Sequence, residues 1–524
     1  MFPRTGGGVT QARSTDGARF AMLVLATIAL ATLWRVAQLF LSPLQLYPDE
    51  AQYWLWSRRL DWGYYSKPPM IAWAIRASTA LGGQAEAWVR LPAPLLHGGA
   101  AAGLFAAGRR LFDARTGAWA AAVYLLMPGV ALSSQVIATD APLLFFLALA
   151  SWAGAAMWSE GGRSAAAALG AALGAAALSK YAAFYVVGGF VLHALMDAEG
   201  RRRLWTPARA ALAAAAFLAV LAPNLIWNAL HGFQTVAHTA ADADLGREAR
   251  AQRSVDLLRP FGFLGSQLGV FGPGPFIALA AAAVAWAGRR LEPRARWLLA
   301  LTAPALVVVT IEASLARANA NWAGAAYASG SLLAARTLTA GGRRWAAALK
   351  ASLALQLVVA VAFSAAMILP DWVDALGLGN SLKRARGWRE AAETARAWRE
   401  TAASAGPVSA VAVDDRFLFN ALAYYGRDWI ASPGAPPLRM WVHEDKAQNQ
   451  AEATAPLSVR DGGRVAFVSS TWREESGWDF ARTQGGREVQ VRLDTRRSRP
   501  LWLYVGEGFA PRPRDPVTGR PTPP

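Results

Sequence analysis

The sequence predicts a polytopic α-helical membrane protein that carries a small α/β domain near its C-terminal end. Hydrophobic residues make up 54% of the 524 residues and charged residues only 17%, whereas an ordinary soluble domain has roughly 25% charged residues. The mean hydropathy is positive, at +0.22. The apolar residues also gather in runs close to the length of about 20 residues that a bilayer core requires. This composition excludes a disordered chain, a collagen and a wholly soluble enzyme.

The apolar runs predict about eleven membrane spans. The runs lie near 20–41, 88–108, 117–137, 140–158, 164–179, 181–196, 207–228, 262–287, 297–315, 321–338 and 345–369. The runs 164–179 and 181–196 are short, and Ser179-Lys180-Tyr181 stands between them. One long broken helix is therefore an alternative to two spans at this point.

The arginine distribution predicts the orientation, because cytoplasmic connections carry an excess of Lys and Arg. If the N-terminus is cytoplasmic, the short connections on that side hold fifteen arginines, and the short outward turns hold only Lys180 and Arg317. The fifteen are Arg109, Arg110, Arg115, Arg163, Arg201, Arg202, Arg203, Arg209, Arg289, Arg290, Arg294, Arg296, Arg336, Arg343 and Arg344. Membrane topology thus explains the net charge of +18 without a nucleic-acid partner. The first span is interpreted as an uncleaved anchor.

The composition changes after Leu369 and predicts a second domain. Short β-like runs lie at 408–413, 438–442, 464–468, 489–493 and 501–505, and a helical segment lies near 417–425. We therefore expect four parts, namely a cytoplasmic tail at 1–19, a transmembrane domain at 20–370 whose first outward loop covers 42–87, an α/β domain at 371–510 on the outer side, and a disordered tail at 511–524.

The first outward loop holds the most informative residues. Asp49 and Glu50 follow the first span, and Tyr64, Tyr65 and Lys67 come less than twenty residues later. A carboxylate at the membrane surface can take a proton from an acceptor hydroxyl, and a cation can hold a lipid-linked phosphate. The aromatic rings suit a sugar face or a prenyl chain. The alternative is an interfacial loop in which Trp and Tyr only anchor at the headgroups.

Two further charges lie at outward turns. Asp140 emerges on the same side as Asp49, and it either caps a helix or takes part in the site. Lys180 lies between two apolar half-spans, where an unpaired charge is costly and often functional, although it could also snorkel to the interface. Asp49 and Asp140 could together hold a divalent metal ion, but the expected chemistry requires no cofactor.

Polar residues at the end of another span complete the candidate set. Asn224 and His231 could donate hydrogen bonds to a sugar or a phosphate, and a structural role is the alternative for each. Asn321 is expected to begin a helix. The chain has no cysteine, which excludes thiolate metal sites and Cys nucleophiles. It also lacks a Walker A loop, a dinucleotide fingerprint, H-E-x-x-H and G-x-S-x-G.

The ordered motifs resemble membrane glycosyltransferases of the GT-C fold in the dolichyl-phosphate-mannose protein mannosyltransferase superfamily. Within it, the chain is similar to the bacterial branch of lipid A aminoarabinose transferases and lipopolysaccharide galacturonosyltransferases. The motifs that carry the resemblance are Asp49-Glu50, Tyr64-Tyr65-Ser66-Lys67-Pro68-Pro69, Arg90-Leu91-Pro92, Thr139-Asp140-Ala141-Pro142, Ser179-Lys180-Tyr181, Pro223-Asn224, His231-Gly232-Phe233, Asn321-Trp322 and, more loosely, Gly387-Trp388 and 415–425.

The resemblance implies transfer of a sugar from a polyprenyl-phosphate donor to a glycolipid or other envelope acceptor at the outer face of a bacterial inner membrane. It implies that Asp49 lies at the reaction centre and that Lys67 contacts the donor phosphate. Aminoarabinose transferases have an acidic residue before this lysine, whereas this chain has Ser66, which disfavours an aminoarabinose donor. The alternatives are a protein O-mannosyltransferase and, in a different class, a secondary transporter or flippase, which predicts inverted repeats.

Overall fold

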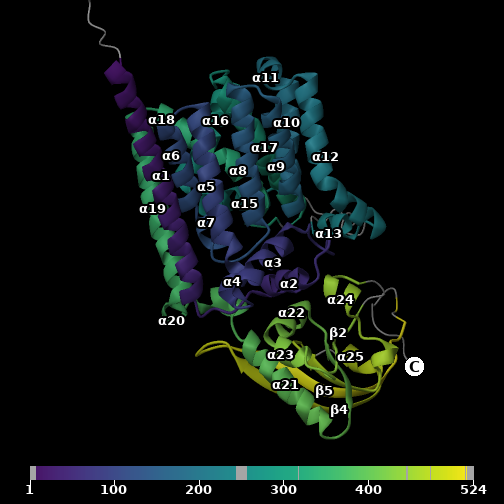
Figure 1. Ribbon diagram of the computed structural model, residues 1–524. Helices are drawn as coiled ribbons and strands as arrows, with labels where there is room; N and C mark the ends of the chain where they lie inside the picture. Colours follow the sequence, from purple (N-terminus) through teal and green to yellow (C-terminus); the bar gives the residue numbers. More distant parts are fainter. Residues whose placement is uncertain are drawn as a thin grey trace, which may run out of the picture. The chain divides into compact units, whose positions relative to one another are not determined.

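The computed structural model describes residues 7–242, 256–316, 318–443, 447–471, 474–513 and 515. The predicted outward Arg317 and most of the predicted tail at 511–524 lie outside these residues. The chain forms two compact units that do not follow its linear order (Figure 1). The helical unit comprises Met1–Leu41, Lys67–Ala74 and Arg90–Ser364, and the sheet unit comprises Ser42–Ser66, Ile75–Val89 and Ala365–Pro524.

The helical unit consists of helices that pack along one another. They are α1 (Gly7–Leu41), α5 (Pro92–Leu111), α6 (Ala114–Leu126), α7 (Pro128–Ser133), α8 (Asp140–Ser159), α9 (Arg163–Ser179), α10 (Ala183–Met196), α11 (Ala198–Leu204), α12 (Pro207–Leu230), α13 (Gln234–Asp242), α15 (Arg259–Val270), α16 (Pro273–Ala287), α17 (Pro293–Leu315), the 3₁₀ helix η1 (Ala320–Ala326), α18 (Tyr327–Ala340) and most of α19 (Arg343–Ile368). The helices α3 (Met70–Gly82) and α4 (Glu86–Arg90) are shared between the units.

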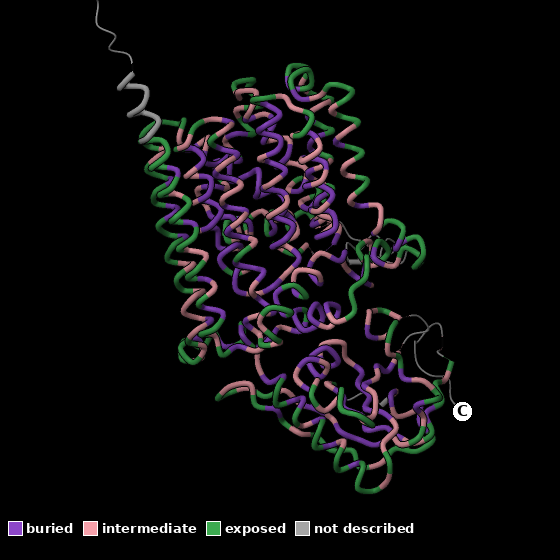
Figure 2. The backbone as a smooth tube through the Cα atoms, in the orientation of Figure 1, coloured by how far each residue is buried: buried purple, intermediate pink, exposed green. Residues whose placement is uncertain are grey.

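Several of these helices are long and apolar enough to cross a bilayer. In the described part of the chain, α8, α12, α17, α19 and the Asp16–Leu41 part of α1 meet this criterion, and α9, α10 and α16 are shorter apolar helices. In the most apolar window of α8, 78% of residues are buried, against 17% in α1. Figure 2 shows the same contrast between a buried interior and an exposed α1. The exposed face of α1 is apolar, as expected for contact with lipid.

Four of the predicted spans are not single α-helices, and the first of them, 88–108, begins in α4 and continues as α5 after Leu91. The run 117–137 breaks at Met127 between α6 and α7, and the run 262–287 breaks at Gly272 between α15 and α16. In both cases the second helix begins with proline at its first position, where the missing N–H costs nothing. Gly272 has φ of +96°, which favours glycine. The run 321–338 begins as η1, so Asn321 lies inside a 3₁₀ turn and does not begin α18.

Small residues allow two of the helices to approach closely. A Cβ atom at Gly170 of α9 would lie 2.0 Å from the backbone oxygen of Ala213 in α12, and one at Gly174 would lie 2.9 Å from the backbone oxygen of Phe217. Glycines four residues apart on one helix face are typical of such packing in membranes. The two glycines therefore determine how closely α9 and α12 pack.

Two buried side chains bridge the break between α6 and α7. Arg35 of α1 donates to Ser134 Oγ at 3.0 Å and to the backbone oxygen of Leu125. His97 of α5 makes hydrogen bonds with Tyr124 of α6 (2.7 Å) and Ser133 of α7 (2.9 Å). Each bridging residue thus holds one group before the break and one after it. The chain then runs directly to the start of α8.

The sheet unit contains a mixed five-stranded sheet in the order β2-β1-β3-β5-β4. The strand β1 pairs in parallel with β2 and β3, and β5 pairs antiparallel with β3 and β4. The strands are β1 (Val408–Val413), β2 (Leu438–Met440), β3 (Arg464–Ser469), β4 (Phe480–Arg492) and β5 (Ser498–Phe509). The helices are α2 (Pro48–Arg58), α20 (Pro370–Ala375), η2 (Gly379–Ala385), α21 (Trp388–Ala403), α22 (Arg416–Tyr425), α23 (Arg427–Ile430), α24 (Gln450–Thr454), η3 (Val459–Asp461) and α25 (Glu474–Trp478).

The alternation of side chains along β1 gives the sheet two buried faces. Val411 and Val413 pack into the core that contains α21 and α22, whereas Ala410 and Ala412 pack against an aromatic cluster on the other face. The five predicted β-like runs all overlap observed strands, and the predicted helical segment at 417–425 is confirmed as α22.

Candidate functional site

The two adjacent carboxylates of the first loop have different surroundings. Pro48 occupies the first turn of α2, and the buried Glu50 accepts the backbone N–H of Tyr47 at 2.8 Å. This bond satisfies a backbone donor just before the helix, as in one half of a capping box. Asp49 is exposed, and its carboxylate makes no hydrogen bond or ion pair with any residue that the structure describes. Asp49 is therefore available for chemistry, whereas Glu50 is engaged in starting the helix.

Helix α2 is held against the C-terminal part of the sheet unit. Asn420 Nδ2 of α22 donates to Gln52 Oε1 at 3.3 Å. The rings of Trp54 and Tyr424 meet edge to face with centroids 4.9 Å apart. Trp54 Nε1 also donates to Gln84 Oε1 at 2.6 Å. The fixed position of Asp49 within the unit thus depends on residues almost four hundred positions along the chain.

The two predicted donor-binding tyrosines use their hydroxyl groups inside the sheet unit. Tyr64 stacks on Trp56 with ring centroids 4.7 Å apart, and its hydroxyl donates to a backbone oxygen of the same loop. Burial raises the pKa of Tyr64 to about 12, although the backbone hydrogen bond from Asp61 opposes the rise. The Tyr65 hydroxyl donates to the backbone oxygen of Ala447. Donor binding by either tyrosine stays a prediction, and both hydroxyls have structural partners.

Asp140 and Lys180 form an ion pair inside the helical unit. Lys180 Nζ donates to Asp140 Oδ1 at 2.9 Å, and the two side chains are only 18% and 15% exposed. A Cβ atom at Gly324 of η1 would lie 3.5 Å from the same carboxylate oxygen, so the Asn321-Trp322 turn lies near this carboxylate. Asp140 pairs with Lys180 and does not bond to the backbone of its own helix, in the described structure. The pairing brings together two residues that sequence reasoning had treated separately.

A short network links the Lys180 turn to helix α12. The Tyr181 hydroxyl donates to Asn224 Oδ1 at 2.9 Å and accepts from Asn228 Nδ2 at 3.0 Å. Asn224 is fully buried, which agrees with the structural alternative for this residue. Its predicted contact with the donor remains a prediction.

His231 follows the last turn of α12 and is exposed. Its ring stacks on Trp227 with centroids 4.1 Å apart, and Nδ1 lies 2.8 Å from the backbone oxygen of Trp227. Because a carbonyl oxygen only accepts, Nδ1 carries the hydrogen in this arrangement. Nε2 makes no hydrogen bond with the described residues and is available to a ligand.

The candidate residues divide between the two units. Asp49, Glu50, Tyr64 and Tyr65 belong to the sheet unit, and Lys67, Asp140, Lys180, Asn224 and His231 belong to the helical unit. Lys67 is half-buried and stands directly before Pro68-Pro69 and α3. In the described part of the chain there is no group of three or more His, Asp or Glu residues that could hold a metal ion. The proposed Asp49–Asp140 metal site therefore remains a prediction.

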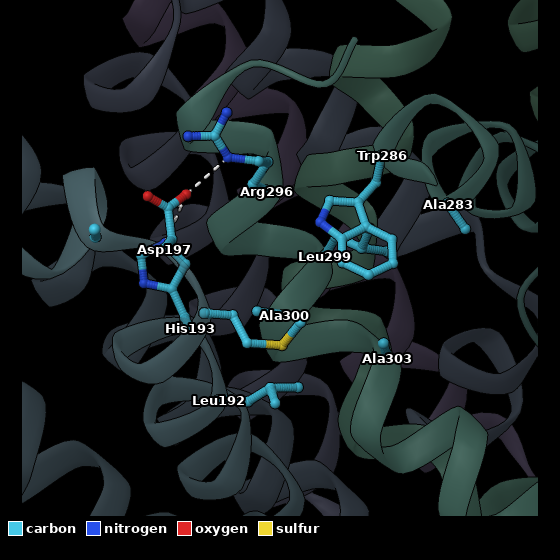
Figure 3. A pocket seen from close by; sticks show the side chains of 11 residues that line it. Leu192, His193, Asp197, Ala283, Trp286, Arg296, Leu299, Ala300 and Ala303 are labelled. Atoms are coloured by element: carbon cyan, nitrogen blue, oxygen red, sulfur yellow. Dashed lines mark hydrogen bonds and ion pairs between the residues drawn. The ribbon is translucent and has the colours of Figure 1, made fainter. Parts of the chain in front are cut away.

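The helical unit also contains an apolar cavity that is separate from these residues. It has a volume of about 370 Å³ and is lined by α10, α16 and α17. Its polar corner consists of His193, Asp197 and Arg296 (Figure 3). Arg296 Nε donates to Asp197 Oδ2 at 2.7 Å. The cavity contains none of the predicted site residues.

Several residues that position the site were not predicted. Helix α2 is attached to the rest of the sheet unit by Gln52, Gln84 and Asn420. The chain before α8 is held by Arg35 and His97. The sequence signals were weak. A lone Arg and a lone His within apolar runs marked buried polar positions, but nothing in the sequence indicated their partners.

Comparison with known proteins places this arrangement in a family. The family model for dolichyl-phosphate-mannose-protein mannosyltransferase matches residues 66–227, a range that includes Lys67, Asp140, Lys180 and Asn224. The chain is also 37% identical over 404 residues to the lipid A galacturonosyltransferase RgtD of Rhizobium johnstonii, covering 76% of this chain and 81% of RgtD. The chain belongs to this family of GT-C membrane glycosyltransferases. The expected family and the expectation of an enzyme are both confirmed.

Solved structures agree with the fold of the transferase. ArnT from Cupriavidus metallidurans bound to undecaprenyl phosphate is similar with a TM-score of 0.62 and 17% identity, over 92% of this chain and 98% of that chain. The apo state of the same protein gives a TM-score of 0.61 and 16% identity, over 92% and 97%. These likenesses confirm a multi-pass helical membrane protein with a C-terminal mixed sheet.

Proposed function

We propose that the transferase moves a sugar from a polyprenyl-phosphate carrier to lipid A or a related envelope glycolipid, at the outer face of a bacterial inner membrane. The identity of 37% to a lipid A galacturonosyltransferase supports this acceptor class. It also favours a uronic acid donor. Ser66 agrees with such a donor, because the residue before Lys67 then has no carboxylate that would repel the carboxylate of the sugar. Within the structure, the observation that carries the proposal is the exposed carboxylate of Asp49, which has no partner among the described residues.

In the proposed reaction, Asp49 takes the proton of the acceptor hydroxyl. The acceptor oxygen attacks the anomeric carbon from the side opposite the phosphate, and the bond from this carbon to the phosphate oxygen breaks. Polyprenyl phosphate leaves with the bonding electrons, so the new glycosidic bond has inverted configuration. Glu50 takes no part because its carboxylate is committed to the backbone of Tyr47.

Cations stabilise the negative charge that grows on the leaving phosphate. Lys67 contacts the phosphate in this proposal. The Lys180 ammonium has three N–H donors, of which the ion pair with Asp140 uses one. Asp140 orients the ammonium, and the remaining donors can meet phosphate oxygens. His231 Nε2 offers a further donor when the ring is protonated.

The predicted topology belongs to the same proposal. The N-terminus is cytoplasmic, about eleven segments cross the bilayer, and residues 371–510 lie on the outer side. The polyprenyl chain lies among the helices in the bilayer, and the reaction needs no soluble cofactor. Addition of a chelator is expected to leave turnover unchanged. If the chelator abolished turnover and one divalent ion restored it, the result would instead support a metal between Asp49 and Asp140.

The test compares two neighbouring carboxylates in the reconstituted enzyme, with polyprenyl-phosphate uronic acid as donor and purified lipid A as acceptor. Glu50→Gln keeps an oxygen that can accept the Tyr47 N–H and should retain turnover. Asp49→Asn should fold equally well and lower kcat by about 10²- to 10⁴-fold, the usual contribution of a general base. Lys67→Ala should mainly raise KM for the donor.

Wild-type turnover in Asp49→Asn would show that the base lies elsewhere. Transfer to Ser or Thr of a peptide, with none to lipid A, would replace the acceptor class with that of a protein O-glycosyltransferase. Movement of the donor across vesicles without transfer would support the transporter alternative.

A further inference from the structure

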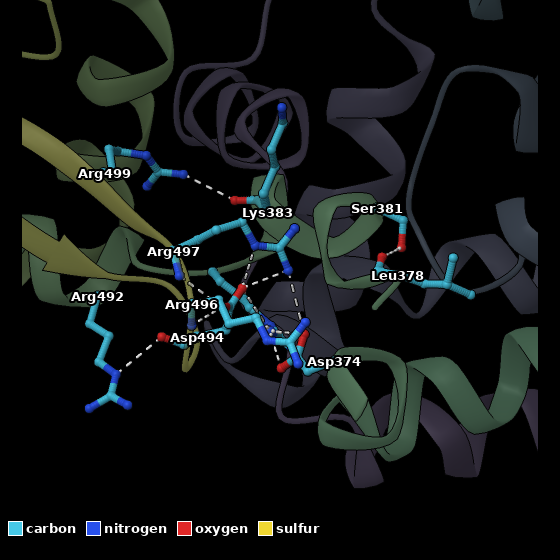
Figure 4. A network of polar contacts seen from close by, with 10 residues as sticks. Asp374, Leu378, Ser381, Lys383, Arg492, Asp494, Arg496, Arg497 and Arg499 are labelled. Carbon is cyan, nitrogen blue, oxygen red and sulfur yellow. Dashed lines mark hydrogen bonds and ion pairs between the residues drawn. The ribbon is translucent and has the colours of Figure 1, made fainter. Parts of the chain in front are cut away.

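A surface of the sheet unit combines exposed apolar and basic side chains. It is formed by residues 369–386, which include α20 and η2, and by residues 492–499, the turn between β4 and β5. Ion pairs hold the two segments together (Figure 4), since Arg386 contacts both Asp374 (2.7 Å) and Asp494 (3.8 Å), and Arg497 contacts the same two carboxylates. We call this the basic–apolar surface.

Its apolar part follows the last membrane-spanning helix directly. Leu369, Trp372, Leu376 and Leu378 are 59%, 49%, 54% and 60% exposed. Among the described residues after Leu378, Val459 is the only other large hydrophobic side chain that is exposed. In the described part of the α/β domain, the exposed large hydrophobic side chains are therefore concentrated where the chain leaves α19.

Its charged part is strongly basic after internal pairing. The two segments hold seven basic and three acidic side chains, namely Lys383, Arg384, Arg386, Arg492, Arg496, Arg497 and Arg499 against Asp371, Asp374 and Asp494. Asp374 and Asp494 are neutralised within the surface by Arg386 and Arg497.

The remaining cations include three without an acidic partner. Lys383, Arg492 and Arg496 are exposed and form no ion pair with any residue that the structure describes. Arg492 donates only to the backbone oxygen of Asp494. The surface therefore presents positive charge that the protein itself does not compensate.

We propose that the basic–apolar surface binds the anionic phospholipid headgroups of the leaflet that the end of α19 reaches. Trp372, Leu376 and Leu378 enter the interface, where Trp is favoured. Lys383, Arg492 and Arg496 bind lipid phosphates, because anionic leaflets attract basic segments next to a membrane helix. A bilayer is the occupant that matches both parts, since the apolar residues are continuous with a span and the charges complement phosphate. The inference does not depend on the proposed sugar transfer.

The absence of cysteine makes a site-specific test direct. Thr495→Cys labels the β4–β5 turn, which belongs to the basic–apolar surface and is more than a hundred residues from α19 in sequence. Ser404→Cys is the matched control, because it is also exposed and follows the far end of α21, about 24 Å from its start at 1.5 Å per residue. Each full-length variant carries a fluorophore and is reconstituted into nanodiscs of phosphatidylcholine with or without phosphatidylglycerol.

Lipids with a nitroxide on the headgroup are expected to quench the Thr495→Cys label strongly in discs that contain phosphatidylglycerol, and the Ser404→Cys label weakly. Adding Lys383→Gln, Arg492→Gln and Arg496→Gln should reduce the first signal to its value in phosphatidylcholine alone. Equal quenching at the two positions would overturn the proposal. Quenching of the Thr495→Cys label that stays the same after the three substitutions would also overturn it. Protection of the label in native membranes but not in nanodiscs would indicate a protein partner and overturn it too.

Discussion

The ion pair between Lys180 and Asp140 permits a test that separates stability from catalysis. The variants are Asp140→Asn, Lys180→Met and the double variant. At 2.9 Å and an effective dielectric constant of about 20, the attraction is about 6 kcal/mol before desolvation is subtracted. Removal of one partner of a buried pair costs about 3–5 kcal/mol because a charge is left behind. Both side chains keep some exposure, so each single variant is expected near the lower limit, about 3 kcal/mol.

The double variant leaves no uncompensated charge and should lose only about 1–2 kcal/mol, because a buried pair replaced by neutral groups is often close to neutral. With each single variant losing about 3 kcal/mol, the coupling energy should therefore be about 4–5 kcal/mol in magnitude. Unfolding of the purified protein in detergent gives the stability, and transfer from polyprenyl-phosphate donor gives the activity. If Lys180 contacts the donor phosphate, the double variant recovers stability but not turnover.

Two results would contradict this reasoning. Additive losses in the double variant would mean that the two charges do not stabilise one another. Wild-type turnover in a stable double variant would restrict the pair to a structural role and remove Lys180 from the donor site.

Three further predictions concern the supporting structure. Tyr124→Phe leaves His97 Nδ1 without its partner and should lower the free energy of unfolding by about 1–2 kcal/mol; an unchanged melting temperature would contradict the bridging role of His97. Gly170→Leu should destabilise the protein far more than Gly188→Leu, because a Cβ meets α12 at the first position and open space at the second; equal melting temperatures would refute this. Although burial opposes ionisation of Asp494, the backbone N–H of Arg496 and the Arg497 side chain lower its pKa below the usual range. The carboxylate therefore stabilises the sheet unit above about pH 4, and this contribution is lost as the pH falls through the lowered pKa. Asp494→Asn should therefore flatten the acid limb of a profile of stability against pH. An unchanged acid limb would show that Asp494 does not contribute to it.

The sequence could predict features that depend on local pattern. Apolar runs and arginine placement indicate which segments cross a membrane, and the short apolar run at 408–413 indicates a strand. The breaks at Met127 and Gly272 were less visible, because small apolar residues continue on both sides of each break. Pro128 and Pro273 are the signals that a closer reading could use, since proline favours the first turn of a new helix.

Contacts between distant residues could not be predicted in the same way. The bond from Asn420 to Gln52 joins residues that are 368 positions apart, and no local pattern specifies such a partner. The different surroundings of Asp49 and Glu50 also depend on geometry, because adjacent helical residues point in directions about 100° apart. The candidate residues were therefore identifiable by type, whereas their partners required the structure.

The arrangement of the sheet has a consequence for how copies of the protein behave when they are crowded. Among the described strands, β4 pairs with β5 alone, so its 13 residues have one unpaired edge. Such an edge can recruit a strand from a neighbouring chain and begin aggregation. Here a register shift between Gln484 and Arg487 bends the edge, and Arg482 and Arg492 add charge to it. The domain can therefore expose a long strand to water and still resist edge-to-edge association.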